Sequence, residues 1–139
     1  MNLKNCKIIK LRRIEDGNDG TISVAEEHRD IPFKTKRVYY IYNLDNASAL
    51  RGKHAHKELE QVIFCMHGSY TIGLDDGTNQ MDIRVEDPSM GVYLGPELWH
   101  TMYDFSDDCV LMVMASDYYN ESDYIRDYDE FKTYLKNQK

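Results

Sequence analysis

The 139-residue sequence has few cysteines, few prolines and no long apolar run. Its three cysteines, Cys6, Cys65 and Cys109, are odd in number and lack C-x-x-C spacing, which excludes a disulfide framework and favours reduced core residues. No stretch approaches the roughly 20 apolar residues that cross a bilayer. The first residues also lack the apolar core of a signal peptide. We therefore expect a cytoplasmic protein that does not enter a membrane.

Positive charge is scarce as well. The chain has 17 Lys and Arg against 24 Asp and Glu, a formal net charge of -7. Polymeric nucleic acid is not an expected partner, because its phosphates bind clusters of Lys and Arg. A nucleoside diphosphate needs only a few local cations, and basic residues do gather at 34–37 and 51–57. Residues 1–139 contain no linker or low-complexity segment and are expected to form one domain.

Short apolar and β-branched segments follow one another through most of the chain. They predict strands at residues 6–11, 21–25, 37–42, 60–66, 69–74, 81–85, 91–94, 99–105 and 110–115. Turn-forming residues such as Asp75-Asp76-Gly77 and Gly95-Pro96 separate them. Many short strands of this kind are typical of an all-β barrel or jelly roll. From about Asp127, apolar residues recur every three or four positions, which predicts a short C-terminal helix on the outside of the barrel.

Two of the five histidines lie in the run Arg51-Gly52-Lys53-His54-Ala55-His56-Lys57. Because alternate residues of a strand share a face, His54 and His56 are expected to point into one space. Glu60 follows shortly after, and His100 comes just after a Gly-Pro turn later in the chain. This H-x-H-x-x-x-E and P-x-x-x-H pattern resembles the two motifs of the cupin superfamily, which implies a jelly-roll β-barrel.

Three functions are compatible with this pattern. His54, His56, Glu60 and His100 match the three-His, one-Glu ligand set of metal-dependent cupins, which would suit Fe(II), Mn(II), Ni(II) or Zn(II) and permit oxygenase or isomerase chemistry. Without a metal, imidazoles with an ordinary pKa near 6.5 can act as acid or base around neutral pH. A non-catalytic sugar-nucleotide-binding cupin would keep arginines and aromatic residues but would not need paired histidines.

Four segments together resemble the sugar 3,4-ketoisomerase family of the cupin superfamily. They are Arg37–Ile41, Arg51–Lys57, Gly91–Pro96 and Ala115–Arg126. The resemblance implies an enzyme without metal or redox cofactor that moves the keto group of dTDP-4-keto-6-deoxy-D-glucose from C4 to C3. Amination of the product would then give 3-amino-3,6-dideoxy sugars for surface polysaccharides. It also implies a homodimer that often exchanges N-terminal strands, so that residues before about Ala25 would lie in the partner's barrel.

The resemblance assigns the chemistry to His54 and His56. We expect His54 to remove the C3 proton and His56 to pass a proton between the C4 and C3 oxygens by way of an enediol. The residues expected to bind substrate are Arg37 and Arg51 at the diphosphate, Tyr39 at the sugar, phosphate or thymine, and Trp99 and His100 where the pocket closes over the hexose.

Overall fold

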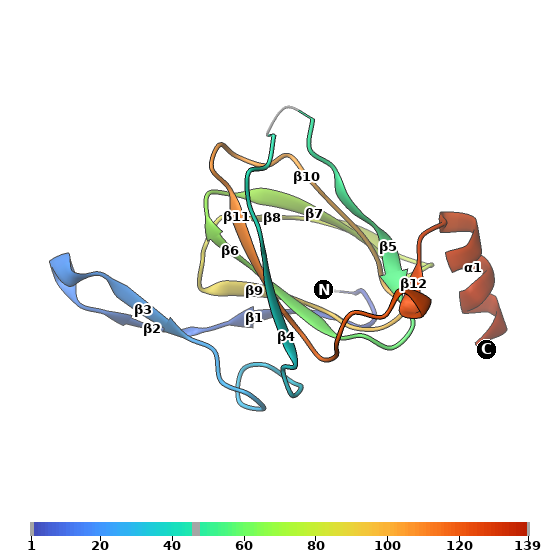
Figure 1. The fold of residues 1–139 in the computed structure, drawn as a ribbon, viewed down its shortest axis with the longest axis horizontal. Coiled ribbons are helices and arrows are strands. Elements are labelled where there is room, and N and C mark those ends of the chain that lie inside the picture. Colours follow the sequence, from blue (N-terminus) through green and yellow to red (C-terminus); the bar gives the residue numbers. More distant parts are fainter. Residues whose placement is uncertain (1, 46–47, 139) are drawn as a thin grey trace.

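Two five-stranded antiparallel sheets face each other and form a jelly roll in the computed structural model, which describes residues 2–45 and 48–138 (Figure 1). The first sheet contains, in spatial order, β1 (Cys6–Lys10), β9 (Met90–Leu94), β6 (Gln61–His67), β11 (Val110–Ala115) and β4 (Arg37–Ile41). The second contains β12 (Tyr124–Ile125), β5 (Arg51–His56), β10 (Trp99–Tyr103), β7 (Tyr70–Asp75) and β8 (Gln80–Val85). The expected all-β jelly roll with a C-terminal helix is confirmed.

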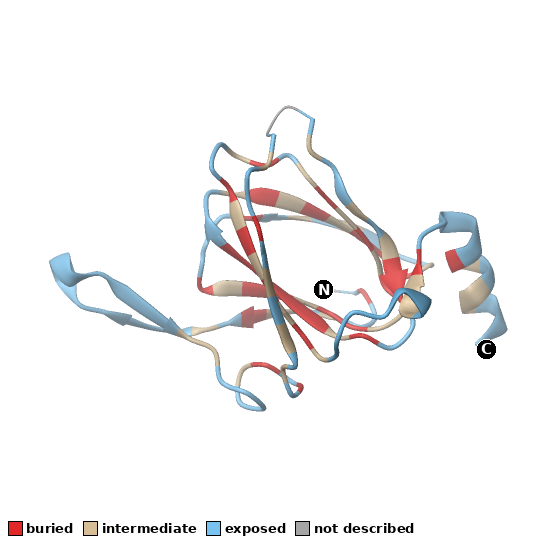
Figure 2. Ribbon diagram, in the orientation of Figure 1, coloured by how far each residue is buried: buried red, intermediate tan, exposed pale blue. Residues whose placement is uncertain are grey.

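A hairpin projects from the barrel near the N-terminus. Strands β2 (Arg12–Glu15) and β3 (Thr21–Val24) form it, joined by a 3-10 turn at Gly17–Asp19. Almost all of its residues are exposed (Figure 2). Strand β3 falls within the predicted segment 21–25, whereas β2 was not predicted. Its sequence, Arg-Arg-Ile-Glu, has a single apolar residue and therefore carries no alternating pattern.

Side-chain alternation divides the apolar residues of β6 between two cores. Ile63 and Cys65 point between the two sheets, whereas Val62 and Phe64 point outward. The outer pair is covered by residues 31–33 of the loop that precedes β4. Because β6 is buried on both faces, it reads in the sequence as a continuous apolar run.

The C-terminal helix α1 (Tyr128–Asn137) packs on the outside of the second sheet. Asp127 is its N-cap residue, and its carboxylate accepts a hydrogen bond from the backbone N–H of Glu130. Phe131 is fully buried against Ala55 and Ile125 of the barrel. The predicted helix and its position are therefore confirmed. No helix in the described part of the chain is long and apolar enough to span a bilayer.

Candidate active site

Three histidine rings meet between the two sheets. His54 and His56 come from β5, and His100 comes from the neighbouring strand β10, where it is paired with His54. The ring centroids of His54 and His56 are 5.0 Å apart, those of His54 and His100 4.6 Å, and those of His56 and His100 6.3 Å. The structure thus brings His54 and His56 together as alternation predicted, and it places His100 beside them as the second motif predicted.

A bulge in β5 sets the position of these rings. His54 pairs with His100 and Gly52 pairs with Thr101, so Lys53 is an extra residue in the ladder. Both Gly52 and Lys53 have positive φ angles, 82° and 59°. A Cβ atom on Gly52 would lie 2.8 Å from the carbonyl oxygen of His100, so the close approach of the two strands requires glycine here.

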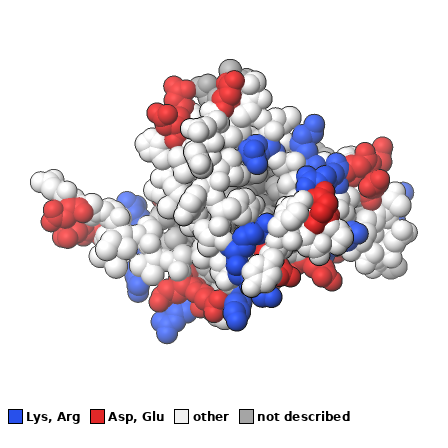
Figure 3. Space-filling model, viewed as in Figure 1, with Lys and Arg blue, Asp and Glu red and all other residues white. Residues whose placement is uncertain are grey.

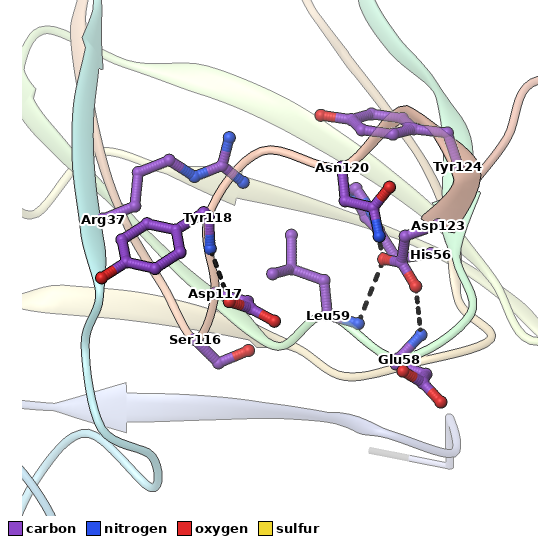
Figure 4. A pocket seen from close by; sticks show the side chains of 10 residues that line it. All are labelled: Arg37, His56, Glu58, Leu59, Ser116, Asp117, Tyr118, Asn120, Asp123 and Tyr124. Carbon is purple, nitrogen blue, oxygen red and sulfur yellow. Dashed lines mark hydrogen bonds and ion pairs between the residues drawn. The ribbon is translucent and has the colours of Figure 1, made fainter.

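Two adjoining cavities open beside the histidine cluster. The first has a volume of about 290 Å³ and is lined by His54 and His100. Its other polar lining residues are Arg37, Tyr39, Arg51, Gln61, Tyr124 and Arg126. The second, of about 250 Å³, is lined by His56 and shares Arg37 and Tyr124 with the first (Figure 4). On this face of the molecule, basic side chains surround a central hollow (Figure 3).

Hydrogen bonds orient two of the imidazoles. Nδ1 of His54 lies 3.1 Å from the carbonyl oxygen of Gly52, and Nδ1 of His56 lies 3.1 Å from Oδ2 of Asp123. A carbonyl oxygen and a carboxylate only accept, so we assign the proton of each neutral ring to Nδ1 and a lone pair to Nε2. Nε2 of His56 is buried and has no hydrogen-bond partner in the described structure. Each ring therefore offers a basic nitrogen.

Burial keeps the three imidazoles uncharged. It is the main cause that lowers the pKa of His54 to about 4, with a further contribution from neighbouring His56. Burial also lowers the pKa of His56, although the carboxylate of Asp123 opposes this shift. The pKa of His100, which is only 3% exposed, lies well below its ordinary value for the same reason. At neutral pH all three rings are available as bases.

Tyr39 and its neighbours form one wall of the first cavity. Nε2 of Gln61 donates a hydrogen bond to the Tyr39 hydroxyl oxygen at 2.8 Å. The guanidinium carbon of Arg37 lies 5.2 Å from the centroid of the Tyr39 ring. Because the hydroxyl oxygen accepts from Gln61, the hydroxyl hydrogen is free to donate to a bound molecule. Arg37, Tyr39 and Arg51 thus lie together, as the substrate-binding prediction requires.

The segment that follows β11 supplies site residues that the motif analysis missed. Arg126 lies over the ring of Tyr124, 4.2 Å from its centroid, and forms two hydrogen bonds with the Glu121 carboxylate at 2.7 and 2.9 Å. This pairing lowers the pKa of Glu121 to about 2. Asp123 and Gln61 were also missed. The segment Ala115–Arg126 carried a signal only through its family resemblance, since its spacing matches no general motif.

The structure places Glu60 outside the cavity, away from the position that the metal-dependent alternative requires. Its Oε1 accepts a hydrogen bond from the Tyr93 hydroxyl at 2.6 Å, next to the outward-facing Val62, while Gln61 faces the cavity. The ligand set of that alternative, three histidines and Glu60, is therefore not assembled. Within residues 2–45 and 48–138, no group of three His, Cys, Asp or Glu side chains is arranged to hold a metal ion.

Trp99 is also misplaced by the sequence-based prediction. It precedes His100 on β10 and therefore points to the opposite face of the sheet. Its ring packs against Phe131 and Tyr128 of helix α1, with centroid distances of 5.7 and 5.4 Å. Trp99 anchors the helix and does not close the cavity, whereas His100 does line it.

The fold and the site together define a cupin-type barrel with three clustered histidines beside a group of arginines. The chain belongs to the family described as FdtA: WxcM-like, C-terminal, whose model matches residues 4–136. Membership confirms the family resemblance that the four sequence segments indicated.

Known proteins similar to this chain act on TDP-linked sugars. The TDP-4-oxo-6-deoxy-alpha-D-glucose-3,4-oxoisomerase of Aneurinibacillus thermoaerophilus is 50% identical over 129 residues, which cover 93% of this chain and 91% of that protein. The 3,4-ketoisomerase QdtA of Thermoanaerobacterium thermosaccharolyticum, solved as a His-to-Asn variant with TDP-4-keto-6-deoxyglucose, is 43% identical with a TM-score of 0.93, covering 98% and 97% of the two chains. The TDP-quinovose 3,4-ketoisomerase WlaRB of Campylobacter jejuni is 46% identical with a TM-score of 0.89, covering 94% and 99%.

Proposed function

We propose that this enzyme is a 3,4-ketoisomerase that converts dTDP-4-keto-6-deoxy-D-glucose into its 3-keto isomer. The observation that carries the proposal is the cluster of three neutral imidazoles, His54, His56 and His100, next to a cavity lined by arginines. Moving a carbonyl to the neighbouring carbon requires only proton transfers, and neutral imidazoles can perform them. The similar proteins named above act on such substrates.

His54 is proposed as the base that removes the proton from C3. The carbonyl at C4 makes this proton acidic, and its removal yields an enediol. With Nδ1 directed at the Gly52 carbonyl, the lone pair on Nε2 is available for the proton. A positioned base of this kind typically contributes about 10² to 10⁴ in rate.

His56 is proposed to move a proton from the oxygen on C3 to the oxygen on C4. Its ring is close enough to His54 for both to reach adjacent carbons of one hexose, since the centroids are 5.0 Å apart. C4 then receives a proton, which leaves the carbonyl at C3. His100 lies against His54 and is proposed to contact the hexose near C4.

Arg37, Arg51 and Arg126 are proposed to bind the diphosphate. They come from β4, from β5 and from the segment that follows β12, and they line the same cavity as His54. A guanidinium group is well suited to phosphate oxygens because it donates several hydrogen bonds in a fixed geometry. Nε of Arg37 is buried without a partner in the described structure, which leaves it free to donate to a ligand. Tyr39 donates its hydroxyl hydrogen to the sugar or a phosphate.

We further propose a cytoplasmic homodimer with exchange of N-terminal strands. Strand β4 is an edge strand, and its outward side chains Val38 and Tyr40 are 51% and 66% exposed. The projecting hairpin carries Ile14 and Ile22, which are paired and exposed. Exposed edges and apolar side chains of this kind favour association with another chain. Light scattering should give a dimer mass for the native protein, and replacing both isoleucines with Asp should lower it to the monomer mass.

The proposed activity is tested by NMR of the protein with dTDP-4-keto-6-deoxy-D-glucose in D₂O, with and without a chelator. We expect a 3-keto product at the same rate in both samples. The variant His54→Asn should lose the activity, and the matched control His67→Asn, at an exposed position at the end of β6, should retain it. Unchanged substrate with the native protein, or conversion that stops on chelation, would refute the proposal.

A further inference from the structure

The carboxylate of Asp123 holds a small hydrogen-bond network beside His56. Oδ2 lies 3.1 Å from Nδ1 of His56 and accepts from the backbone N–H of Leu59 at 3.2 Å. Oδ1 accepts from the backbone N–H of Glu58 at 2.8 Å. Figure 4 shows this carboxylate facing the two amides. Asp123 therefore fastens the 3-10 turn Glu121–Asp123 to the segment that directly follows β5.

This network gives His56 a partner that the other two rings lack. Nδ1 of His54 faces the uncharged carbonyl of Gly52, and Nδ1 of His100 has no hydrogen-bond partner in the described structure. A carboxylate stabilises a protonated imidazole more strongly than a carbonyl oxygen does. Of the three rings, His56 can therefore best hold an extra proton for a short time.

On the basis of the proposed function, we infer that Asp123 is a positioning residue of the isomerase. It holds His56 with Nδ1 protonated and Nε2 bare, and so makes His56 the imidazole that carries the proton between the two substrate oxygens. His54 therefore acts directly on the proton at C3. Asp123 acts indirectly, through its effect on His56, on the proton that moves between the two oxygens.

The proton balance of the step follows from this arrangement. When His54 takes the C3 proton, the electron pair forms the C3–C4 double bond and the C4 oxygen gains negative charge. Nε2 of His56 accepts the proton of the C3 hydroxyl and releases it to the C4 oxygen. The Nδ1 proton stays on His56 throughout, so Asp123 stabilises the imidazolium but does not become protonated. The proton held by His54 is returned at C4, and no oxidant or reductant is needed.

Charged and titratable groups surround His56 on several elements. They are His54 on β5, His100 on β10, Arg37 on β4, Tyr124 on β12, Asp123 in the 3-10 turn, and Arg126 after β12. Burial lowers the pKa of His56 and the two arginines lower it further, whereas Asp123 raises it. Among these groups, Asp123 is the one whose removal should depress the basicity of His56 most directly.

The variant Asp123→Asn tests the inference because an amide cannot satisfy all three donors. If its oxygen faces Glu58, its NH₂ group faces Nδ1 of His56 and forces the opposite tautomer. If its oxygen faces His56, the NH₂ group opposes the backbone N–H of Glu58, and the ring loses its anionic partner. We expect kcat to fall by about 10² or more, with KM nearly unchanged. The acidic limb of the kcat profile should move to lower pH, because the pKa of His56 falls.

The matched control is Asp127→Asn. Asp127 also accepts a backbone hydrogen bond, but as the N-cap of helix α1 away from the cavity, and asparagine is an equally good N-cap. This variant should retain native kcat and its pH profile. Nitrogen-15 NMR of the native protein gives a second test that needs no variant, since it reports which nitrogen of His56 bears the proton.

Each result has a defined meaning. If the native protein converts no substrate, the proposed function is refuted. The nitrogen-15 NMR spectrum still tests which nitrogen of His56 bears the proton, because it does not depend on activity. A native protein with His56 protonated on Nε2 overturns the inference, whatever the kinetics. Native kcat in Asp123→Asn also overturns it. Loss of kcat in both Asp variants would show a general effect of replacing an aspartate whose carboxylate accepts backbone hydrogen bonds, and it would likewise count against a positioning role.

Discussion

Lowering the pH from about 7.5 to about 5 should destabilise the fold through His54. Its pKa is about 4 in the folded protein, whereas a histidine in the unfolded chain titrates near 6.5. Between these values the unfolded chain binds more protons than the folded one, so the free energy of unfolding falls as the pH falls. At a pH about 1.5 units below the pKa of histidine in the unfolded chain, this one ring lowers the free energy of unfolding by roughly 2 kcal/mol. Above pH 6.5 the contribution is complete.

The variant His54→Asn isolates this contribution because it removes the titrating ring. Guanidinium unfolding followed by tryptophan fluorescence at several pH values, at one protein concentration, measures the free energy of unfolding of both proteins. The native protein should lose about 2 kcal/mol more than the variant between neutral pH and pH 5. His56, His100 and the carboxylates titrate in both proteins, so the difference reports His54.

Equal pH dependence in the two proteins would refute this reasoning. It would mean that His54 titrates alike in the folded and unfolded chain, as a solvated ring would. A folded-state pKa near 6.5 would also remove the physical basis for a neutral base buried beside two other imidazoles. The same outcome would weaken the proposed role of His54 at C3.

Three further predictions concern positions around the site. Phe131→Ala should lower the free energy of unfolding by about 3–5 kcal/mol because it leaves a void under helix α1. The fluorescence of the single tryptophan, which packs on Phe131, should shift to the red. At low temperature kcat should stay native, because the helix lies outside the candidate active site. Gly52→Ala should lower both the melting temperature and kcat, since its Cβ would meet the His100 carbonyl; calorimetry and turnover assays check this. Gln61→Leu should reduce kcat/KM by up to about tenfold in steady-state assays through loss of its hydrogen bond to Tyr39, and native kcat/KM would show that this bond does not matter.

Most of the fold was predictable because its signals are local. Strand β11, for example, begins and ends where its apolar residues do, and the N-cap Asp127 marks the start of α1. Strand β12 was not predicted because it has only two residues and exists through its pairing with β5. The bulge at Lys53 was equally hidden, since it depends on the register between β5 and β10.

The placement of the candidate residues was predicted correctly where side-chain alternation could be applied within one strand. This holds for His54 and His56, and for Arg37 and Tyr39. The placement was wrong where a residue was assigned to the cavity only from its position in a sequence motif. The metal-dependent alternative placed Glu60 in the cavity, but β6 begins one residue later and presents Gln61 there. Trp99 and His100 are adjacent on β10 and point to opposite faces, so that His100 lines the cavity whereas Trp99 packs against helix α1. Because successive side chains alternate between faces, an error of one position exchanges the inside of the barrel for the outside.

The presence of Gln61 in the cavity, in place of its neighbour Glu60, has a chemical consequence. A further carboxylate beside the imidazoles, in addition to that of Asp123, would raise their pKa values. The Gln61 amide adds no charge to rings that burial already keeps neutral, and the positively charged residues that line the first cavity are Arg37, Arg51 and Arg126. Under the proposed function, a sugar nucleotide would be oriented by its own charge, with the diphosphate at the arginines and the uncharged hexose at the imidazoles. In the proposed mechanism, the negative charge that develops on the C4 oxygen would raise the pKa of the adjacent imidazoles, so that they would take up a proton at the enediol stage and not before.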